Sequence, residues 1–268
     1  MYAILGHDLP ANGKRVIALH LIAIAAVFMS GSLAACAGLA GLGGRVLIHD
    51  YQLNGTYADS MGGPDLQPNG GHLQGFGYQF GAGEGLTLAE SSIRPDSYMI
   101  EMRLRIDEPN LVGNGWLKLV DFKSLSIDSG FYIKGNTPSF YFVNGCGDLA
   151  DVAQGCDPQA GVGRMELIGT PAQIVNDDPV TIMIERDGAR SQVSLLVDGN
   201  RQRWRTDAMG LMGAAPAPRE TEFFRDPLGE AMFEDPPVVQ FLIDDMATGG
   251  GEAGAGMIDY IRVFAPVG

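Results

Sequence analysis

Apolar and polar residues alternate along most of the chain after about residue 46, and this period of two is the pattern of a half-buried β-strand. The clearest case is SYMIEMRLRID, residues 97–107, in which five apolar side chains alternate with charged ones. Such a strand places one face in a core and the other in water. Gly, Asn, Asp and Pro interrupt the alternation about every eight to twelve residues, as turns between strands would.

About a dozen strands are predicted in this way. VSLLVDGNRQRWR, residues 193–205, is a hairpin, because Asp198-Gly199-Asn200 supplies the positive φ angles of a tight turn. No long amphipathic helix is predicted, although a short one could form within 219–234. No period of 20 to 50 residues repeats. We therefore expect one all-β domain over 46–268, a two-sheet antiparallel jelly-roll sandwich. The other strands are expected at 45–51, 72–80, 85–89, 116–124, 130–135, 139–145, 180–188, 238–245 and 257–264.

The beginning of the chain has the composition of an export signal. Lys14 and Arg15 precede a run at 16–36 that carries no charge except for a proton on His20. Its apolar part, 16–29, is shorter than the roughly 20 residues that span a bilayer, which favours a cleaved signal over a permanent anchor. We expect a signal peptide at 1–36, a short linker at 37–45 and then the domain.

Cys36 ends the apolar run, and the cleavage site can be interpreted in two ways. Leu33-Ala34-Ala35-Cys36 resembles the lipobox of bacterial lipoproteins, in which the cysteine accepts a lipid and the lipid anchor is the only membrane contact. Alternatively, Ala35-Cys36-Ala37 fits an ordinary signal peptidase site and gives a secreted protein. We favour the lipobox, which predicts a lipoprotein anchored at the cell envelope.

The other two cysteines also favour export. Cys146 and Cys156 lie in a segment rich in glycine and aspartate, with no histidine nearby. Because a metal site would need more soft ligands than two, we predict a disulfide that closes a small loop, which suits an oxidising compartment.

The formal net charge of −14 limits the partners of the chain. An acidic surface repels phosphates, so nucleic acid and anionic headgroups are excluded as partners. Calcium, neutral sugars and basic proteins remain open.

Both ends of the expected domain resemble a known family. YQLNGTYADSMGGPDL, residues 51–66, looks like the opening of laminin-G-like modules of the concanavalin A-like superfamily, and 241–264 resembles their closing strands. The same ending resembles that of bacterial laminarinase-type glucanases, which share the sandwich. The resemblance implies the fold much more closely than a function, because one fold hosts many ligands.

Signatures of catalysis are missing from the sequence. The Glu-x-Asp-x-x-Glu strand of the laminarinase-type enzymes does not occur, and Glu101 and Glu166 each lack a second carboxylate at strand spacing. After the signal only His49 and His72 remain, without a Gly-x-Ser-x-Gly elbow, so both histidines are assigned structural roles. We expect a non-catalytic binding module. The alternative is a divergent glucanase or polysaccharide lyase whose carboxylates converge only in the fold.

An acidic cluster near the C-terminus predicts a structural calcium ion. Asp245 ends an apolar strand, Glu252 lies in a glycine-rich loop, and carboxylate oxygens are the ligands that Ca²⁺ prefers. The resemblance to laminarinase-type sandwiches implies Asp259 as a ligand, completed by Asp50 of the first strand. The predicted ligands are thus Asp50, Asp245 and Asp259. Alternatively, these carboxylates cap turns and accept hydrogen bonds from loop amides.

Two long insertions, 144–178 and 210–237, are the expected recognition loops, because binding residues tend to lie on loops of a rigid scaffold. Phe223, Phe224 and Arg225 are predicted to stack on a glycan or to dock an envelope protein. Alternatively, the phenylalanines of the second insertion, Phe223, Phe224 and Phe233, fold back and close one end of the core. Trp116 and Trp204 are further candidates for the core.

Overall fold

The structure is a computed structural model that describes residues 44–89, 92–107, 115–126, 128–142, 165–169, 174, 178–207, 222–226, 229, 231–245 and 251–267. The chain divides into two units, Met1–Arg45 and Val46–Gly268, and the described residues lie almost wholly in the second. The described part holds no helix that is long and apolar enough to cross a membrane.

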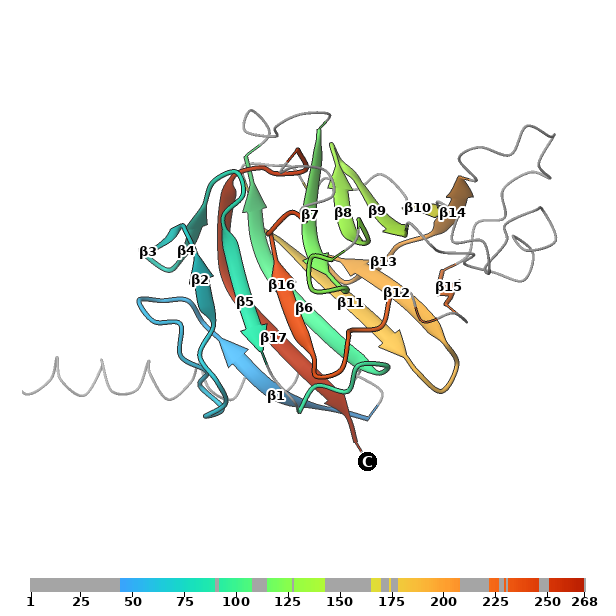
Figure 1. The fold of residues 1–268 in the computed structure, drawn as a ribbon, viewed down its shortest axis with the longest axis horizontal. Helices are drawn as coiled ribbons and strands as arrows, with labels where there is room; N and C mark the ends of the chain where they lie inside the picture. The colour runs from blue at the N-terminus through green and yellow to red at the C-terminus, as the bar shows by residue number, and fades with distance from the viewer. Residues whose placement is uncertain are drawn as a thin grey trace, which may run out of the picture. The chain divides into compact units, whose positions relative to one another are not determined.

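The described strands form two antiparallel sheets of a sandwich (Figure 1). Sheet A has the order β13-β12-β11-β6-β17-β4-β3, with β1 beside β17 and β15 beside β12. Sheet B has the order β14-β10-β9-β8-β7-β16-β5-β2. The strands of sheet A are β1 (Arg45–Tyr51), β3 (His72–Gln74), β4 (Gly77–Phe80), β6 (Tyr98–Ile106), β11 (Val180–Asp187), β12 (Gln192–Val197), β13 (Asn200–Arg201), β15 (Phe224–Arg225) and β17 (Gly256–Pro266). The strands of sheet B are β2 (Gln67–Asn69), β5 (Gly85–Ala89), β7 (Trp116–Asp121), β8 (Gly130–Lys134), β9 (Thr137–Phe142), β10 (Met165–Gly169), β14 (Trp204–Asp207) and β16 (Val238–Phe241).

The core lies between the apolar faces of the two sheets. Alternate residues of β6, from Tyr98 to Ile106, are fully or almost fully buried, as the period of two predicts. Aromatic rings join the layers: the Tyr98 ring of sheet A lies 4.5 Å from Phe233 and 6.4 Å from Phe122 at the end of β7. Each large apolar side chain buried here contributes about 1.5–3 kcal/mol relative to its exposed state, so the alternating pattern of the sequence accounts for the closure of the sandwich.

The sequence predicts this architecture well. The all-β antiparallel sandwich is confirmed, and β1, β5 and β11 begin where the alternation begins. The predicted hairpin joins β12 to β13 through Asp198 and Gly199, whose φ angles are +48° and +74°. The segment at 219–234 differs from expectation, because its residues Phe224–Arg225 form strand β15.

Several predictions fall outside the described residues. Cys36, Cys146 and Cys156 lie there, together with the proposed signal segment. Lipidation and the disulfide therefore stay predictions.

Candidate functional site

The candidate site begins with an irregularity in β7 that places two charged residues on one face of sheet B. In a regular strand, residues three apart point to opposite faces. The pairing of β7 with β8 shifts register between Lys118 and Val120, so Leu119 and Val120 both enter the core. This bulge turns Asp121 to the same outer face as Lys118.

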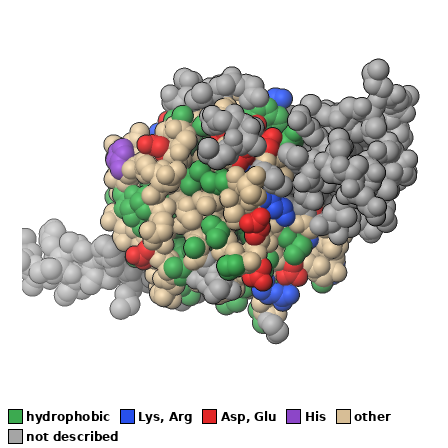
Figure 2. Space-filling view, in the orientation of Figure 1, with side chains coloured by type: hydrophobic (Ala, Val, Ile, Leu, Met, Phe, Trp, Pro, Cys, Tyr) green, Lys and Arg blue, Asp and Glu red, His purple; other side chains and the backbone are tan. Residues whose placement is uncertain are grey.

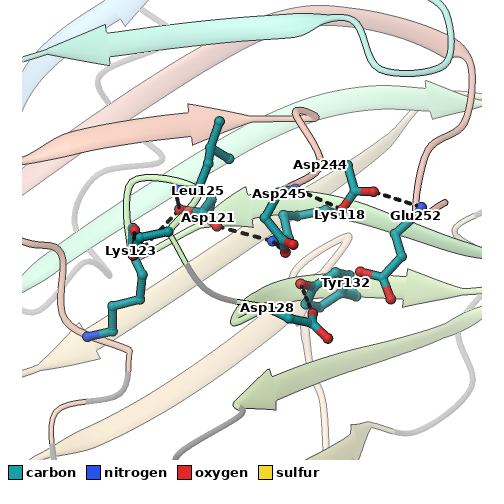
Figure 3. A network of polar contacts seen from close by, with 10 residues as sticks. Lys118, Asp121, Lys123, Leu125, Asp128, Tyr132, Asp244, Asp245 and Glu252 are labelled. Atoms are coloured by element: carbon teal, nitrogen blue, oxygen red, sulfur yellow. Dashed lines mark hydrogen bonds and ion pairs between the residues drawn. The ribbon is translucent and has the colours of Figure 1, made fainter. Parts of the chain in front are cut away.

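Lys118 is the centre of a buried ionic network on that face (Figure 3). Its ammonium Nζ donates to Asp121 Oδ2 at 3.1 Å and also to Asp245 Oδ2, and all three side chains are fully buried. The Nζ atom also lies 5.1 Å from the centre of the Tyr132 ring on β8. A buried charge is tolerated only when it is paired and hydrogen-bonded, and Lys118 meets both conditions.

The segment that follows β16 completes the network through its backbone. Asp244 accepts hydrogen bonds from the amides of Asp245 at 2.9 Å and Glu252 at 3.0 Å. The carbonyl of Glu252 in turn accepts from the amide of Lys118 at 3.1 Å. The Glu252 carboxylate therefore lies beside the ionic pair although it is far away in sequence (Figure 3).

Three carboxylates converge at this point. Ligand oxygens of Asp128, Asp245 and Glu252 lie within 4.8 Å of one another. Asp128 also accepts a hydrogen bond from the Tyr132 hydroxyl at 2.9 Å, whereas Glu252 Oε2 is buried and has no hydrogen-bond partner. Burial, and after it the nearby carboxylates of Asp128 and Asp244, raise the pKa of Glu252 to about 7.

Among the described residues, the network holds more carboxylates than ammonium groups. Asp121, Asp128, Asp244, Asp245 and Glu252 lie close together, and the Lys118 ammonium donates to two of them, Asp121 and Asp245. Like charges close together in a low dielectric cannot all ionise cheaply. A proton on Glu252, whose pKa is raised, or a bound cation would reduce this cost.

An aromatic group lies beside the ionic network on the same face. The Trp116 ring is 5.7 Å from Tyr132 and 6.4 Å from Tyr141, and the two tyrosine rings are 6.3 Å apart. Lys134 Nζ lies 4.5 Å from the centre of the Trp116 ring. Tyr132 is buried and Trp116 is 9% exposed, whereas Tyr141 is half-buried and Lys134 is exposed. Tyr141 and Lys134 thus form the accessible rim of this aromatic group.

Charges on the outer surface are mixed. Figure 2 shows that the basic side chains on the viewed face of the described part lie near acidic ones and form no stripe.

Comparison with known proteins finds similarity in fold. No protein-family model matches the sequence, and no curated protein matches it. The binding domain of botulinum neurotoxin DC, solved in complex with rat synaptotagmin II, has a TM-score of 0.50 and 11% identity over 82% of this chain and 48% of that one. Domain 4 of AbnA, a GH43 extracellular arabinanase from Geobacillus stearothermophilus in complex with arabinotriose, has a TM-score of 0.46 and 10% identity over 83% of this chain and 94% of that one.

The binding domain of botulinum neurotoxin serotype D has a TM-score of 0.47 and 10% identity, over 82% of this chain and 48% of that one. The chain spans about half the length of these toxin domains. At such identities the likeness concerns the fold alone.

The structure separates the three predicted calcium ligands. Asp245 belongs to the converging carboxylates, but Asp50 and Asp259 lie on β1 and β17 of sheet A. Asp50 accepts a hydrogen bond from Arg262 Nε at 3.1 Å, and Asp259 accepts one from Arg103 Nε at 3.0 Å. An arginine at each position already neutralises the carboxylate, so the three do not form one site.

The predicted recognition residues lie on the other sheet. Phe224 and Arg225 form β15, which pairs with β12 of sheet A, and Phe223 just before them is 41% exposed. Phe233 of the same insertion is buried against Tyr98, as the alternative of a core-closing aromatic predicted. Trp204 is also in the core, but Trp116 faces outward from sheet B.

Sequence reasoning missed the central residue of the network. Lys118 stands in the strand-like WLKLVDF, where a period of two would leave a lysine in water. One signal was available: Lys118 and Asp121 are both polar in an otherwise apolar run, and they are three residues apart. Two residues at that spacing in a strand can point to the same face of the sheet if a bulge lies between them.

Replacing Lys118 tests whether it holds the network together. Lys118→Met should lower the free energy of unfolding by about 3–5 kcal/mol, because Asp121 and Asp245 then remain buried without a cation. Chemical denaturation at neutral pH measures this. Lys134→Met, a matched change at an exposed lysine on the next strand, should change it by less than about 1 kcal/mol, because it removes only a surface contact with the Trp116 ring. Equal effects in the two variants would contradict the assignment.

The raised pKa of Glu252 predicts a stability that falls as pH rises. The unfolded chain ionises Glu252 near 4.5, whereas the folded chain keeps the proton up to about 7, so the folded state binds more protons between these values. We expect a loss on the order of 1–2 kcal/mol across this window, less than the full shift implies because Glu252 is partly exposed.

Glu252→Gln should remove most of this loss. In Glu84→Gln the loss should remain, because backbone amides of Gly71 and Gly81 lower the pKa of Glu84 instead of raising it. Denaturation curves at about pH 5 and pH 7.5 for the three proteins measure the difference. A wild-type chain that is no less stable at the higher pH, or a loss unchanged in Glu252→Gln, would refute the assignment.

Proposed function

We propose that this chain is an exported binding module that recognises a glycan on the outer face of sheet B, with no chemistry at that face. A lipid on Cys36 would hold it at the cell envelope, and the laminin-G-like resemblance of both ends of the domain supports a recognition role. An envelope protein is the other partner that the composition allows.

The observation that carries this proposal is the aromatic group of Trp116, Tyr132 and Tyr141 beside a line of polar side chains. Sugar rings present C–H faces that pack on aromatic rings, and their hydroxyl groups need nearby hydrogen-bonding partners. Tyr141 and Lys134 supply an accessible ring edge and a donor, and Asp128 and Glu252 supply acceptors. Stacking next to charged acceptors favours a neutral sugar over an anionic one.

We further propose that a calcium ion joins Asp128, Asp245 and Glu252. Two oxygens on one calcium ion lie at most about 5 Å apart, because each Ca–O distance is about 2.3–2.6 Å. The spread of 4.8 Å among the three carboxylates meets this limit. Glu252 Oε2, buried without a hydrogen-bond partner, is an atom that such an ion would satisfy. Lys118 limits the site, because its ammonium already contacts Asp245.

Glycan binding can be tested on a glycan array followed by titration of the best ligand. Tyr141→Ala should weaken binding by about tenfold or more, the loss expected when one stacking ring is removed. Tyr260→Ala is the matched control: this ring packs against Arg262 on β17 of sheet A, and its loss should leave affinity unchanged. If the affinity falls in Tyr260→Ala and not in Tyr141→Ala, the binding site lies on sheet A instead of sheet B.

Hydrolysis of the glycan is a second candidate function that one observation favours. A glycosidase needs two close carboxyl groups, one of them protonated near neutral pH, and Glu252 beside Asp128 has this arrangement. Against it, Asp245 is buried and held by Lys118, which leaves less room for a substrate. Release of reducing ends by the wild-type chain, abolished in Glu252→Gln, would replace binding with hydrolysis as the function.

Calcium binding can be measured by thermal unfolding with calcium or with a chelator. At a hundred times the dissociation constant, calcium should stabilise the chain by about 2.7 kcal/mol and raise its melting temperature by a few degrees. Asp128→Asn should abolish this response. Asp259→Asn should keep it, because Asp259 is paired with Arg103. Loss of the response in Asp259→Asn alone would restore the ligand set implied by the family resemblance.

A further inference from the structure

A serine, a histidine and an aspartate from separate segments meet at the edge of the sandwich, away from the ionic network. His49 lies on β1, Asp59 lies in the loop that follows it, and Ser92 follows β5 of sheet B. His49 Nδ1 is 2.7 Å from Asp59 Oδ2, and His49 Nε2 is 3.4 Å from Ser92 Oγ. This is the order of contacts in a nucleophile, a base and an orienting carboxylate.

Asp59 is fixed by its surroundings. Its Oδ1 atom accepts hydrogen bonds from the amides of Asp50 at 2.8 Å and Met61 at 2.9 Å, and Oδ2 accepts one from Gly63 at 3.0 Å. Burial raises the pKa of Asp59, but the hydrogen bonds from these amides and from His49 lower it by more. The pKa of Asp59 therefore lies below its usual value. Asp59 is therefore an ionised carboxylate held in a single orientation.

The ionised aspartate determines the tautomer of His49. A carboxylate can only accept, so Nδ1 carries a hydrogen, and in the neutral tautomer Nε2 is then the acceptor. Nε2 faces the Ser92 hydroxyl, which can donate to it. The distance of 3.4 Å is longer than an ideal hydrogen bond, and such contacts are commonly loose before a substrate binds.

The packing around the pair leaves the base shielded and the nucleophile accessible. The His49 and Asp59 side chains are 3% and 0% exposed, whereas Ser92 is exposed. Gly63 allows the close approach, because a Cβ atom there would lie 2.5 Å from Asp59 Oδ2 and 2.7 Å from His49 Nδ1. A purely structural role, in which His49 joins β1 to the following loop, requires only the contact with Asp59. The second contact, with the exposed Ser92 hydroxyl, is not needed for that role.

We propose that Ser92 is an activated nucleophile that accepts acyl groups from carboxylic esters. The Ser92 oxygen forms a bond to the ester carbonyl carbon, its proton passes to His49 Nε2, and the bond to the alcohol breaks as that proton is delivered to the leaving oxygen. Water, deprotonated by the same nitrogen, then releases the carboxylic acid and restores the serine. Esters fit better than amides, because an alcohol leaves more readily than an amine.

A fluorophosphonate probe applied to the full chain tests this proposal. The Ser92 oxygen should bond to phosphorus as fluoride leaves, giving one adduct that peptide mass spectrometry maps to Ser92. Ser92→Ala should remove it. Ser60→Ala is the control: Ser60 is also exposed, but its hydroxyl donates to Asp50 and has no histidine partner among the described contacts, so the adduct should remain. A wild-type chain without an adduct on Ser92 overturns the proposal.

A cysteine comparison tests the role of His49 without replacing a buried residue. In Ser92→Cys, His49 should draw the proton from the thiol, and alkylation by iodoacetamide should be at least tenfold faster than in Ser60→Cys. The reaction is followed at each cysteine by mass spectrometry, so the native cysteines do not interfere. Equal rates at the two positions would show that the histidine activates nothing and would overturn the proposal. Hydrolysis of p-nitrophenyl acetate, lost in Ser92→Ala, is the expected accompanying activity.

Discussion

The burial of two apolar sheet faces against each other is the constraint on which every other feature of this structure depends. The long strands β6 and β11 place alternate residues in the core, as β6 does from Tyr98 to Ile106. Functional side chains can then lie only on the outer faces of the sheets or at the edges where the sheets meet. Both candidate sites obey this division: the ionic network lies on the outer face of sheet B, and the histidine pair lies at the edge beside β1.

The bulge in β7 is where this division is locally broken. By sending Leu119 and Val120 inward together, it gives the core an additional apolar side chain and turns Asp121 outward beside Lys118. The lysine then connects β7 to Asp245 after β16, and the carbonyl of Glu252 bonds to its backbone. One irregular residue thus ties together segments more than a hundred positions apart in the sequence. The same irregularity concentrates negative charge, which any ligand at this face must neutralise or avoid.

Much of the fold could be predicted because its information is local. Alternation in β6 and the Asp198-Gly199 turn depend on residues within a few positions of each other, and both were predicted from the sequence. The candidate sites depend on distant partners. Asp245 was expected to join Asp50 and Asp259, yet Arg262 and Arg103 contact those two instead. No local pattern shows which cation a carboxylate will meet across a sheet. His49 was assigned a structural role because the sequence has no Gly-x-Ser-x-Gly elbow, and the serine that it contacts, Ser92, is 43 residues away.

The two sites use one physical device toward different ends. In each site, a buried carboxylate holds a loop by accepting hydrogen bonds from backbone amides. Asp59 accepts from three amides, and Asp244 accepts from those of Asp245 and Glu252. At His49 the aspartate accepts from Nδ1 and so turns Nε2 toward an exposed hydroxyl, an arrangement suited to proton transfer. Around Lys118, burial and then the neighbouring carboxylates raise the pKa of Glu252 to about 7, which favours the capture of a proton or a cation. The balance of charge at each site, more than the fold that carries it, determines which of these chemistries it can support.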